Sequence, residues 1–194
     1  MTRLAAPKPD EMNAAQRAVY DEVVAGPRGY IDGPLAELLH IPELCRHVQR
    51  IGAYVRFNGQ LPPMQRELAM CMAARHISSQ YVWVAHARQA RMAELPEDII
   101  QVLIARQRPN FHDDDDLECV YDFVQNLLSG GAVEQKLYDR ALKRFGQQKL
   151  IELVAITGQF TFISMVSNVF DLESRHKDTA KLPPDSEPRK DPFP

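Results

Sequence analysis

The chain has 194 residues, 45% of them hydrophobic, and its 23 basic and 26 acidic residues leave a formal net charge of -3. This length suits one domain with one core, and the charge balance, with no long basic run, argues against a nucleic-acid partner or an anionic membrane surface. No apolar stretch reaches the roughly 20 residues of a spanning helix and the N-terminus has no apolar leader, so we expect a soluble, cytoplasmic protein.

Hydrophobic residues recur at helical spacing along most of the chain, and Pro, Asp and Gly mark several ends of these patterns. The predicted helices cover residues 10–25, 42–57, 64–77, 81–95, 97–107, 117–128, 133–145 and 147–173. Residues 26–34 predict a loop, and the apolar face expected for the helix over 42–57 consists of Leu44, Val48, Ile51 and Val55. Because hydrophobic and polar residues do not alternate along any segment, as they would in a half-buried strand, the predicted fold class is all-α.

The two ends of the chain differ in composition. Residues 1–176 predict a single all-α domain, whereas residues 177–194 are Pro-rich and have little to bury. We expect this tail to be an extended arm or disordered. The helix over 147–173 is apolar on nearly every side and must be covered by its own chain or by a second copy, which predicts a homo-oligomer.

Two stretches with similar sequences stand out within the chain. Residues 65–86 and 149–170 each run from an acidic residue and Leu, at Glu67 and Glu152, through small and apolar residues into an aromatic-rich segment. The similarity has few identities. It indicates either two related helical hairpins or two buried helices of similar composition.

The three cysteines are Cys45, Cys71 and Cys119. Their odd number, wide spacing and lack of a C-x-x-C pair fit neither a disulfide framework nor a zinc or redox centre. We therefore expect buried, reduced thiols and no metal site.

Glu67 and His86 are the residues best placed to carry chemistry, because each lies on a helix without the polar face that would hold it in solvent. A carboxylate removed from water needs a partner, since an unpaired buried charge costs several kcal/mol. An imidazole suits this role and can donate or accept protons near neutral pH. The alternative is a structural hydrogen bond or a helix cap.

Arg56 ends its predicted helix beside apolar residues. Its planar guanidinium could bind a substrate carboxylate through paired hydrogen bonds, or it could complement the negative end of the helix dipole. The sequence leaves both interpretations open.

Residues 33–90 contain a "P-E-L" helix, an "R-E-L-A" helix and a "Y-x-W-x-x-H" segment in this order. Together they resemble the carboxymuconolactone decarboxylase family and are similar to the related alkyl hydroperoxidase D proteins, over about Gly33 to Phe170. The resemblance implies an all-α domain that works without metal or organic cofactor and assembles into oligomers of up to six subunits.

The resemblance carries over residue by residue only in part. Glu67 and His86 match the family's proton-handling pair. The positions of the two redox cysteines of the hydroperoxidase branch hold Ser79 and Val82, so a dithiol peroxidase cycle has neither nucleophile nor resolving thiol. The decarboxylase branch usually has Glu at the position of Val82.

What the resemblance implies is a cofactor-independent decarboxylase-like lyase that acts on a small carbonyl or lactone carboxylic acid. His86 would donate the proton, Glu67 would orient it and Arg56 would hold a carboxylate. Tyr81, Val82 and Trp83 would shape the pocket. Two alternatives remain: an isomerase or different lyase using the same pair, and a non-catalytic helical oligomer in which the pair is structural.

Overall fold

The computed structural model describes residues 2–174 and 181–183, and within them it contains helices and no strand. The all-α prediction is confirmed for this part of the chain. In order, the elements are η1 (Pro9–Glu11), α1 (Ala14–Ala25), α2 (Gly33–Leu38), α3 (Pro42–Ala53), the π-helical turn η2 (Tyr54–Asn58), α4 (Pro63–His76), α5 (Gln80–Met92), α6 (Glu97–Ile104), α7 (Asp115–Gly130) and α8 (Gln135–Val169).

Local signals in the sequence explain several helix ends. Asp114 begins α7 by accepting hydrogen bonds from the backbone N–H groups of Asp116 and Leu117, and Gly131 ends it in the left-handed conformation. Gly146 has non-helical backbone angles inside α8, with φ 72° and ψ 171°. The expected end of a helix at Gly146 is therefore a bend between two helical parts.

One helix was not predicted. Residues 26–34 were expected to form a loop, but α2 begins within them, at Gly33, and continues to Leu38. This helix has only six residues, which is too short for a hydrophobic repeat to be recognised in the sequence.

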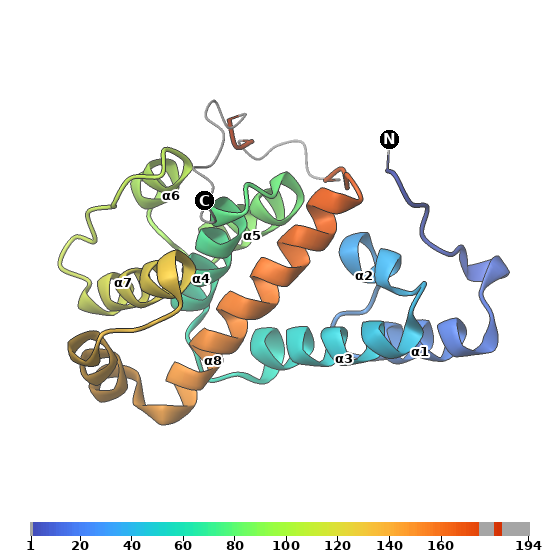
Figure 1. The fold of residues 1–194 in the computed structure, drawn as a ribbon, viewed down its shortest axis with the longest axis horizontal. Coiled ribbons are helices and arrows are strands. Elements are labelled where there is room, and N and C mark those ends of the chain that lie inside the picture. The colour runs from blue at the N-terminus through green and yellow to red at the C-terminus, as the bar shows by residue number, and fades with distance from the viewer. Residues whose placement is uncertain (1, 175–180, 184–194) are drawn as a thin grey trace.

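Helix α8 crosses the molecule between two groups of helices (Figure 1). Helices α4 to α7 pack with α8 around the larger hydrophobic cluster, which includes Leu68, Trp83, Ile100 and Leu153. Helices α1 to α3 pack around a smaller cluster with the end of α8, through Val166. The seam between these clusters holds the candidate site.

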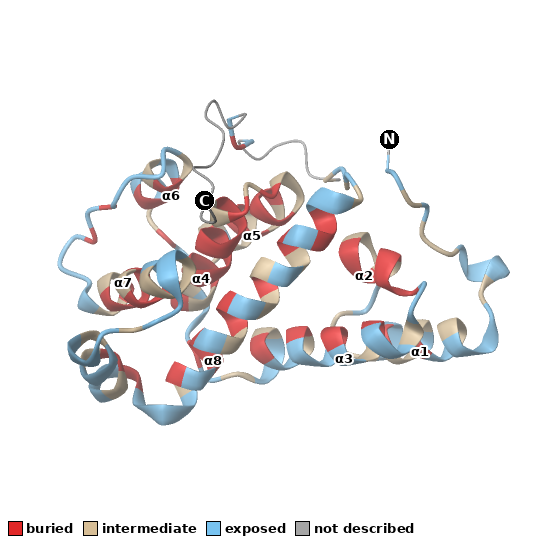
Figure 2. Cartoon of the chain, viewed as in Figure 1, coloured by how far each residue is buried: buried red, intermediate tan, exposed pale blue. Residues whose placement is uncertain are grey.

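The buried face of α3 differs from the prediction. Val48 and Val55 are buried as expected, but Leu44 is 39% and Ile51 48% exposed. Besides Val48, α3 buries Cys45, Gln49 and Gly52. The colouring in Figure 2 shows the same banding on α3 and α8, with exposed segments alternating with buried ones.

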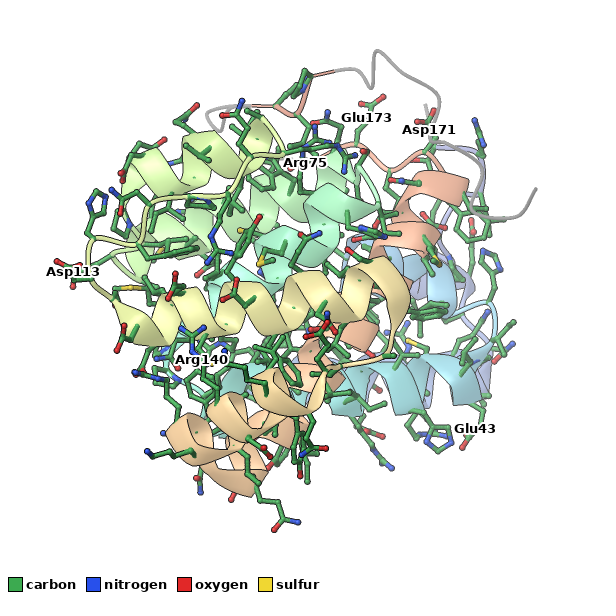
Figure 3. The ribbon with its side chains drawn as sticks, turned by 60° about the vertical axis from the view of Figure 1, so that its left-hand side comes forward. Glu43, Arg75, Asp113, Arg140, Asp171 and Glu173 are labelled. Carbon is green, nitrogen blue, oxygen red and sulfur yellow. The ribbon has the colours of Figure 1, made fainter. Side chains whose placement is uncertain are left out.

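An ion-pair network fixes the first part of α8 to α7. Arg140, labelled in Figure 3, donates hydrogen bonds to Glu118 at 2.9 Å and to Asp122 at 3.0 Å. Arg108 reaches the same two carboxylates from the chain before α7. Because all four side chains are partly exposed, we assign this network a role in orientation rather than a large contribution to stability.

Most of the predicted tail, residues 177–194, lies outside the described residues. The stretch 181–183 packs against α5: Leu182 is buried, its N–H donates to Gln80 Oε1 at 3.0 Å, and Gln80 Nε2 donates to the Leu182 carbonyl at 2.6 Å.

Contrary to the sequence expectation, α8 contains an 18-residue window that is apolar enough, by length and composition, to cross a membrane. Half of this window is buried inside the protein, as in the core helix of a soluble protein, so it is weak evidence for a membrane span.

Candidate functional site

A cavity of about 130 Å³ lies at the seam between the two hydrophobic clusters. Leu35 and Val48 contribute to its wall from the smaller cluster, and Val82 and Phe160 contribute from the larger one. Its polar lining residues include Arg28, Asp32, Arg56, Tyr81, His86, Gln89 and Gln159. The volume is below the roughly 300 Å³ of a pocket for a drug-sized molecule, which restricts the site to small ligands.

Helix α5 supplies one whole side of the cavity. Each helical residue turns the side-chain direction by about 100°, so residues one, four, five and eight places after a given position share its face. The residues of α5 that line the cavity have this spacing: Tyr81, Val82, Ala85, His86 and Gln89.

Trp83 does not have the predicted role. It is fully buried in the larger hydrophobic cluster and is not among the residues that line the cavity. Two positions after Tyr81, it lies about 200° further around α5 and faces the core instead of the cavity. The expectation that Trp83 shapes the pocket is therefore corrected.

Glu67 on α4 and His86 on α5 are in direct contact. Glu67 Oε2 lies 2.7 Å from His86 Nδ1, and the two side chains are 6% and 8% exposed. His86 lines the cavity, whereas Glu67 stands behind it. The structure thus brings together the two residues that the sequence singled out, with the imidazole between the carboxylate and the cavity.

The charge state of Glu67 determines the tautomer of His86. Burial acts to raise the pKa of Glu67, but the charge and hydrogen bond of His86, with a smaller effect of Arg66 and Arg56, outweigh it and lower this pKa. An ionised carboxylate only accepts hydrogen bonds, so Nδ1 must donate to it. Nε2 is then the ring nitrogen that remains to exchange a proton with a molecule in the cavity.

Two further neighbours hold this pair in place. The Arg66 Nε atom lies 3.5 Å from the second oxygen of Glu67 and adds a weaker ion pair. The Phe160 ring meets the His86 ring edge to face, with 4.6 Å between centroids. The imidazole is therefore fixed by a carboxylate on one side and by an aromatic ring on another.

Arg56 lines the cavity from the π-helical turn η2. Such turns shift the direction of side chains relative to a regular helix and occur often at functional sites. The Arg56 guanidinium lies over the ring of Phe57, 5.2 Å from its centroid. No ion pair to Arg56 is formed within residues 2–174 and 181–183, so its positive charge is available to the cavity.

Arg28 is a site residue that the sequence analysis missed. It lies in the loop between α1 and α2, and its Nη2 reaches to 3.6 Å from the position that a Cβ on Gly52 would occupy. No periodic pattern marks a loop residue, and only the packing of that loop on α3 brings it to the cavity. Composition and spacing therefore gave no signal for it.

Tyr81 forms part of the wall through a close approach to α2. A Cβ added to Gly33 would lie 2.0 Å from the Tyr81 hydroxyl, and Gly33 has φ +49°. Only glycine satisfies both conditions without strain. The Tyr81 side chain is therefore seated on the first turn of α2, between the cavity and a second pocket beside the N-terminal segment.

The residues described here contain no group of three or more His, Cys, Asp or Glu side chains that could hold a metal ion. All three cysteines are free and buried, as predicted. The chain matches no model of a known protein family and no curated protein.

Proposed function

We propose that this chain is a cofactor-independent lyase that removes CO₂ from a small carbonyl or lactone carboxylic acid, as the resemblance to carboxymuconolactone decarboxylases implies. The observation that carries the proposal is the buried Glu67–His86 pair, 2.7 Å apart, with its imidazole at a cavity that also receives an arginine. Proton transfer needs such a pair, and binding of the acid needs such a cation.

In the proposed reaction, the bond between the carboxylate carbon and its neighbour breaks and CO₂ leaves. The electron pair enters the adjacent carbonyl as an enolate, so the substrate serves as its own electron sink. The protonated Nε2 of His86 then delivers a proton to carbon, and solvent returns one to the ring. Glu67 holds the imidazole in position and stabilises its charged form, while Arg56 binds a carboxylate.

Val82 defines the kind of substrate. It is 2% exposed and lines the cavity where the decarboxylases usually have Glu. A polar substrate group that forms a hydrogen bond to that Glu in the decarboxylases would lack a partner at Val82, which would weaken binding by about 1 to 3 kcal/mol. We therefore expect poor turnover of 4-carboxymuconolactone itself and a natural substrate with an apolar group toward Val82.

The direct test is CO₂ release from a panel of lactone acids and β-keto acids by the purified full chain. Turnover that His86→Ala removes supports the proposal. Absence of turnover across the panel, with the fold of the protein intact, favours the alternatives, an isomerase or a structural Glu–His pair.

The proposal includes an oligomer with the alkyl hydroperoxidase D-like arrangement. On α8, five apolar residues are 37% to 60% exposed and recur at helical spacing along one face, namely Ile151, Val154, Phe162, Met165 and Val169. Leu44 and Ile51 add exposed apolar surface on α3. Apolar residues exposed in a row along one helix face often mark a contact surface between protein chains, which supports an oligomer. A monomer at micromolar concentration by light scattering would refute this part.

A further inference from the structure

A second cavity, of about 210 Å³, lies among α4, α6 and α7 and shares no described lining residue with the candidate active site. Arg75 and Arg106 line it. We propose that these two arginines bind the acidic segment of this chain, defined as residues 184–187 with the sequence P-D-S-E. The inference concerns a contact within the chain and does not depend on the proposed lyase activity.

The charge of this cavity is the first argument. Arginine stays protonated in proteins, so Arg75 and Arg106 give the lining two permanent positive charges. The described lining residues include no Asp or Glu, and the imidazole of His76 is neutral or positive and cannot offset the arginines. The acidic segment contains Asp185 and Glu187 and no basic residue, so its charge is equal and opposite.

The second argument is that the two guanidinium groups meet at one hydroxyl. Ser78 Oγ accepts a hydrogen bond from Arg75 Nη1 at 3.1 Å and one from Arg106 Nη2 at 2.7 Å. Two positive charges held this close repel each other, and an uncharged hydroxyl does not neutralise them. A carboxylate beside them would do so, with strong hydrogen bonds to planar guanidinium donors.

Arg75 is fixed in this position before any anion binds. It is 7% exposed, lies near the end of α4 and is labelled in Figure 3. Its Nε donates to the carbonyl of Ile104, the last residue of α6, at 2.9 Å. The site therefore has one rigid, buried cation and one exposed cation, Arg106, at its edge. Little side-chain freedom is left to lose at Arg75 on binding.

The path of the chain is the third argument. Leu182 is 3% exposed, packs in the larger hydrophobic cluster and forms two hydrogen bonds with the side chain of Gln80. Gln80 follows Ser78, the hydroxyl shared by the two arginines, by two residues. Asp185 follows Leu182 by three residues, which span about 10 Å when extended. The carboxylates thus begin beside the arginines.

This attachment favours the acidic segment over a free anion. A group tethered by a short linker has an effective concentration in the millimolar range, which a free acid or phosphate would have to exceed. The linker also begins with Pro183 and Pro184, whose fixed φ angles reduce the conformational entropy lost on docking.

Docking of the acidic segment would hold Leu182 on the first turn of α5. Gln80 is the first residue of this helix, and Tyr81 and His86 further along it line the candidate active site. The contact would therefore support the helix that supplies one side of that site.

The experiment measures amide hydrogen exchange of Leu182 in the full-length chain by NMR. This N–H donates to Gln80 Oε1 and exchanges when the contact opens. Asp185→Asn with Glu187→Gln should raise the exchange rate about tenfold, since it removes hydrogen-bonded charges. Arg106→Gln should raise it by a similar factor, and combining all three substitutions should raise it little further, because they remove the same interaction.

Two variants serve as matched controls. Asp191→Asn removes an acid beyond the acidic segment, and Arg88→Gln removes a half-buried arginine of α5 that does not line this cavity. Both should leave the exchange of Leu182 unchanged, and no variant should change the exchange of buried Val124 on α7, which reports on the whole fold.

Several results would overturn the inference. They are an unchanged Leu182 rate in Asp185→Asn with Glu187→Gln or in Arg106→Gln, effects that multiply when the substitutions are combined, and an equal effect of Asp191→Asn. Inorganic phosphate at about 10 mM should not shift the amide signals of Ser78 and Arg106 in the unaltered chain, because the acidic segment occupies the cavity. Shifts there that saturate with phosphate would show a free anion as the occupant and would also overturn it.

Discussion

Two buried carboxylates, Glu67 on α4 and Glu152 on α8, have similar sequence settings and different surroundings. Each precedes a leucine in a helix rich in apolar residues, and they are 4% and 3% exposed. A count of buried charges would treat them alike. Their partners distinguish them.

Glu152 is satisfied by two backbone N–H groups, a hydroxyl and a side-chain amide. Its Oε2 accepts the backbone N–H groups of Gln60 at 2.8 Å and Leu61 at 3.0 Å, and its Oε1 accepts hydrogen bonds from Tyr54 and Gln148. These bonds join α8 to the link between η2 and α4. The carboxylate thus holds backbone in place and has no capacity left for a ligand.

Glu67 instead uses its oxygens on an imidazole that faces a cavity and on a neighbouring arginine. The imidazole is the partner in this comparison that general acid–base catalysis most often uses. Burial alone is therefore a poor sign of a functional carboxylate. An imidazole partner that lines a cavity is the feature that separates the two residues.

The largest effect should come from removing this partner. His86→Ala should lower the turnover of a substrate found in the CO₂ screen by about 100- to 10,000-fold, the usual contribution of a general acid or base. Steady-state kinetics would measure the loss of kcat, with His47→Ala, at an exposed histidine of α3, as the control. Full activity in a folded His86→Ala protein would make the Glu67–His86 pair structural.

Substitution of Glu152 should have the opposite effect: it should lower the free energy of unfolding and leave catalytic turnover unchanged. Glu152→Ala leaves the N–H of buried Leu61 and its neighbour without their acceptor, so we expect the free energy of unfolding to fall by about 2 to 3 kcal/mol. Urea unfolding would measure this against Glu134→Ala, which removes an exposed carboxylate before α8. If the two variants were equally stable, the assigned role of Glu152 would be wrong.

This contrast also shows what the sequence could predict. The helices and the buried character of α4 follow from local periodicity, and Glu67 and His86 stood out because they interrupt apolar helices. The internal similarity was less informative. Residues 65–86 turn at Ser78, which has φ +54°, between α4 and α5, whereas residues 149–170 remain one helix up to Val169. The interpretation as two related hairpins is therefore wrong.

Other parts of the site depend on contacts between distant segments. Arg28 reaches the cavity only because its loop packs against α3, and Gln159 is fixed there by donating to the Val48 carbonyl at 3.0 Å. No pattern within either segment indicates these contacts. The role predicted for Trp83 was wrong for a simpler reason. The prediction did not consider that Trp83 lies on the face of α5 that points away from the cavity.

Acid should weaken the protein through both carboxylates. Burial acts to raise both pKa values. Hydrogen bonds outweigh this effect at Glu152, and the charge and hydrogen bond of His86, with nearby arginines, outweigh it at Glu67, so each pKa lies below the ordinary value of 4.5 in the folded chain. The unfolded state then binds more protons, and the stabilisation present above pH 4.5 is lost as pH falls through the folded pKa.

Glu67→Gln and Glu152→Gln should therefore each give a shallower loss of unfolding free energy between about pH 5 and pH 3 than the unaltered chain, by urea titration at each pH. They should differ in activity, which Glu67→Gln lowers and Glu152→Gln preserves. Loss of activity in both variants, at equal stability, would remove the distinction drawn between the two carboxylates.

The smallest effect concerns Cys71, which lies one turn after Glu67 on α4. Burial, and next the negative charge of Glu67, raise the pKa of this thiol, which is the opposite of the activation that a reactive cysteine needs. Glu67 therefore cannot serve a thiol in the way it serves His86. Cys71→Ala should leave turnover in the CO₂ screen unchanged and lower the free energy of unfolding by about 1 kcal/mol. We expect neither this variant nor the unaltered chain to turn over organic hydroperoxides. The assay follows consumption of an organic hydroperoxide. Turnover by the unaltered chain that disappears in Cys71→Ser would show that the thiol reacts and that the effect of Glu67 on it has been misread.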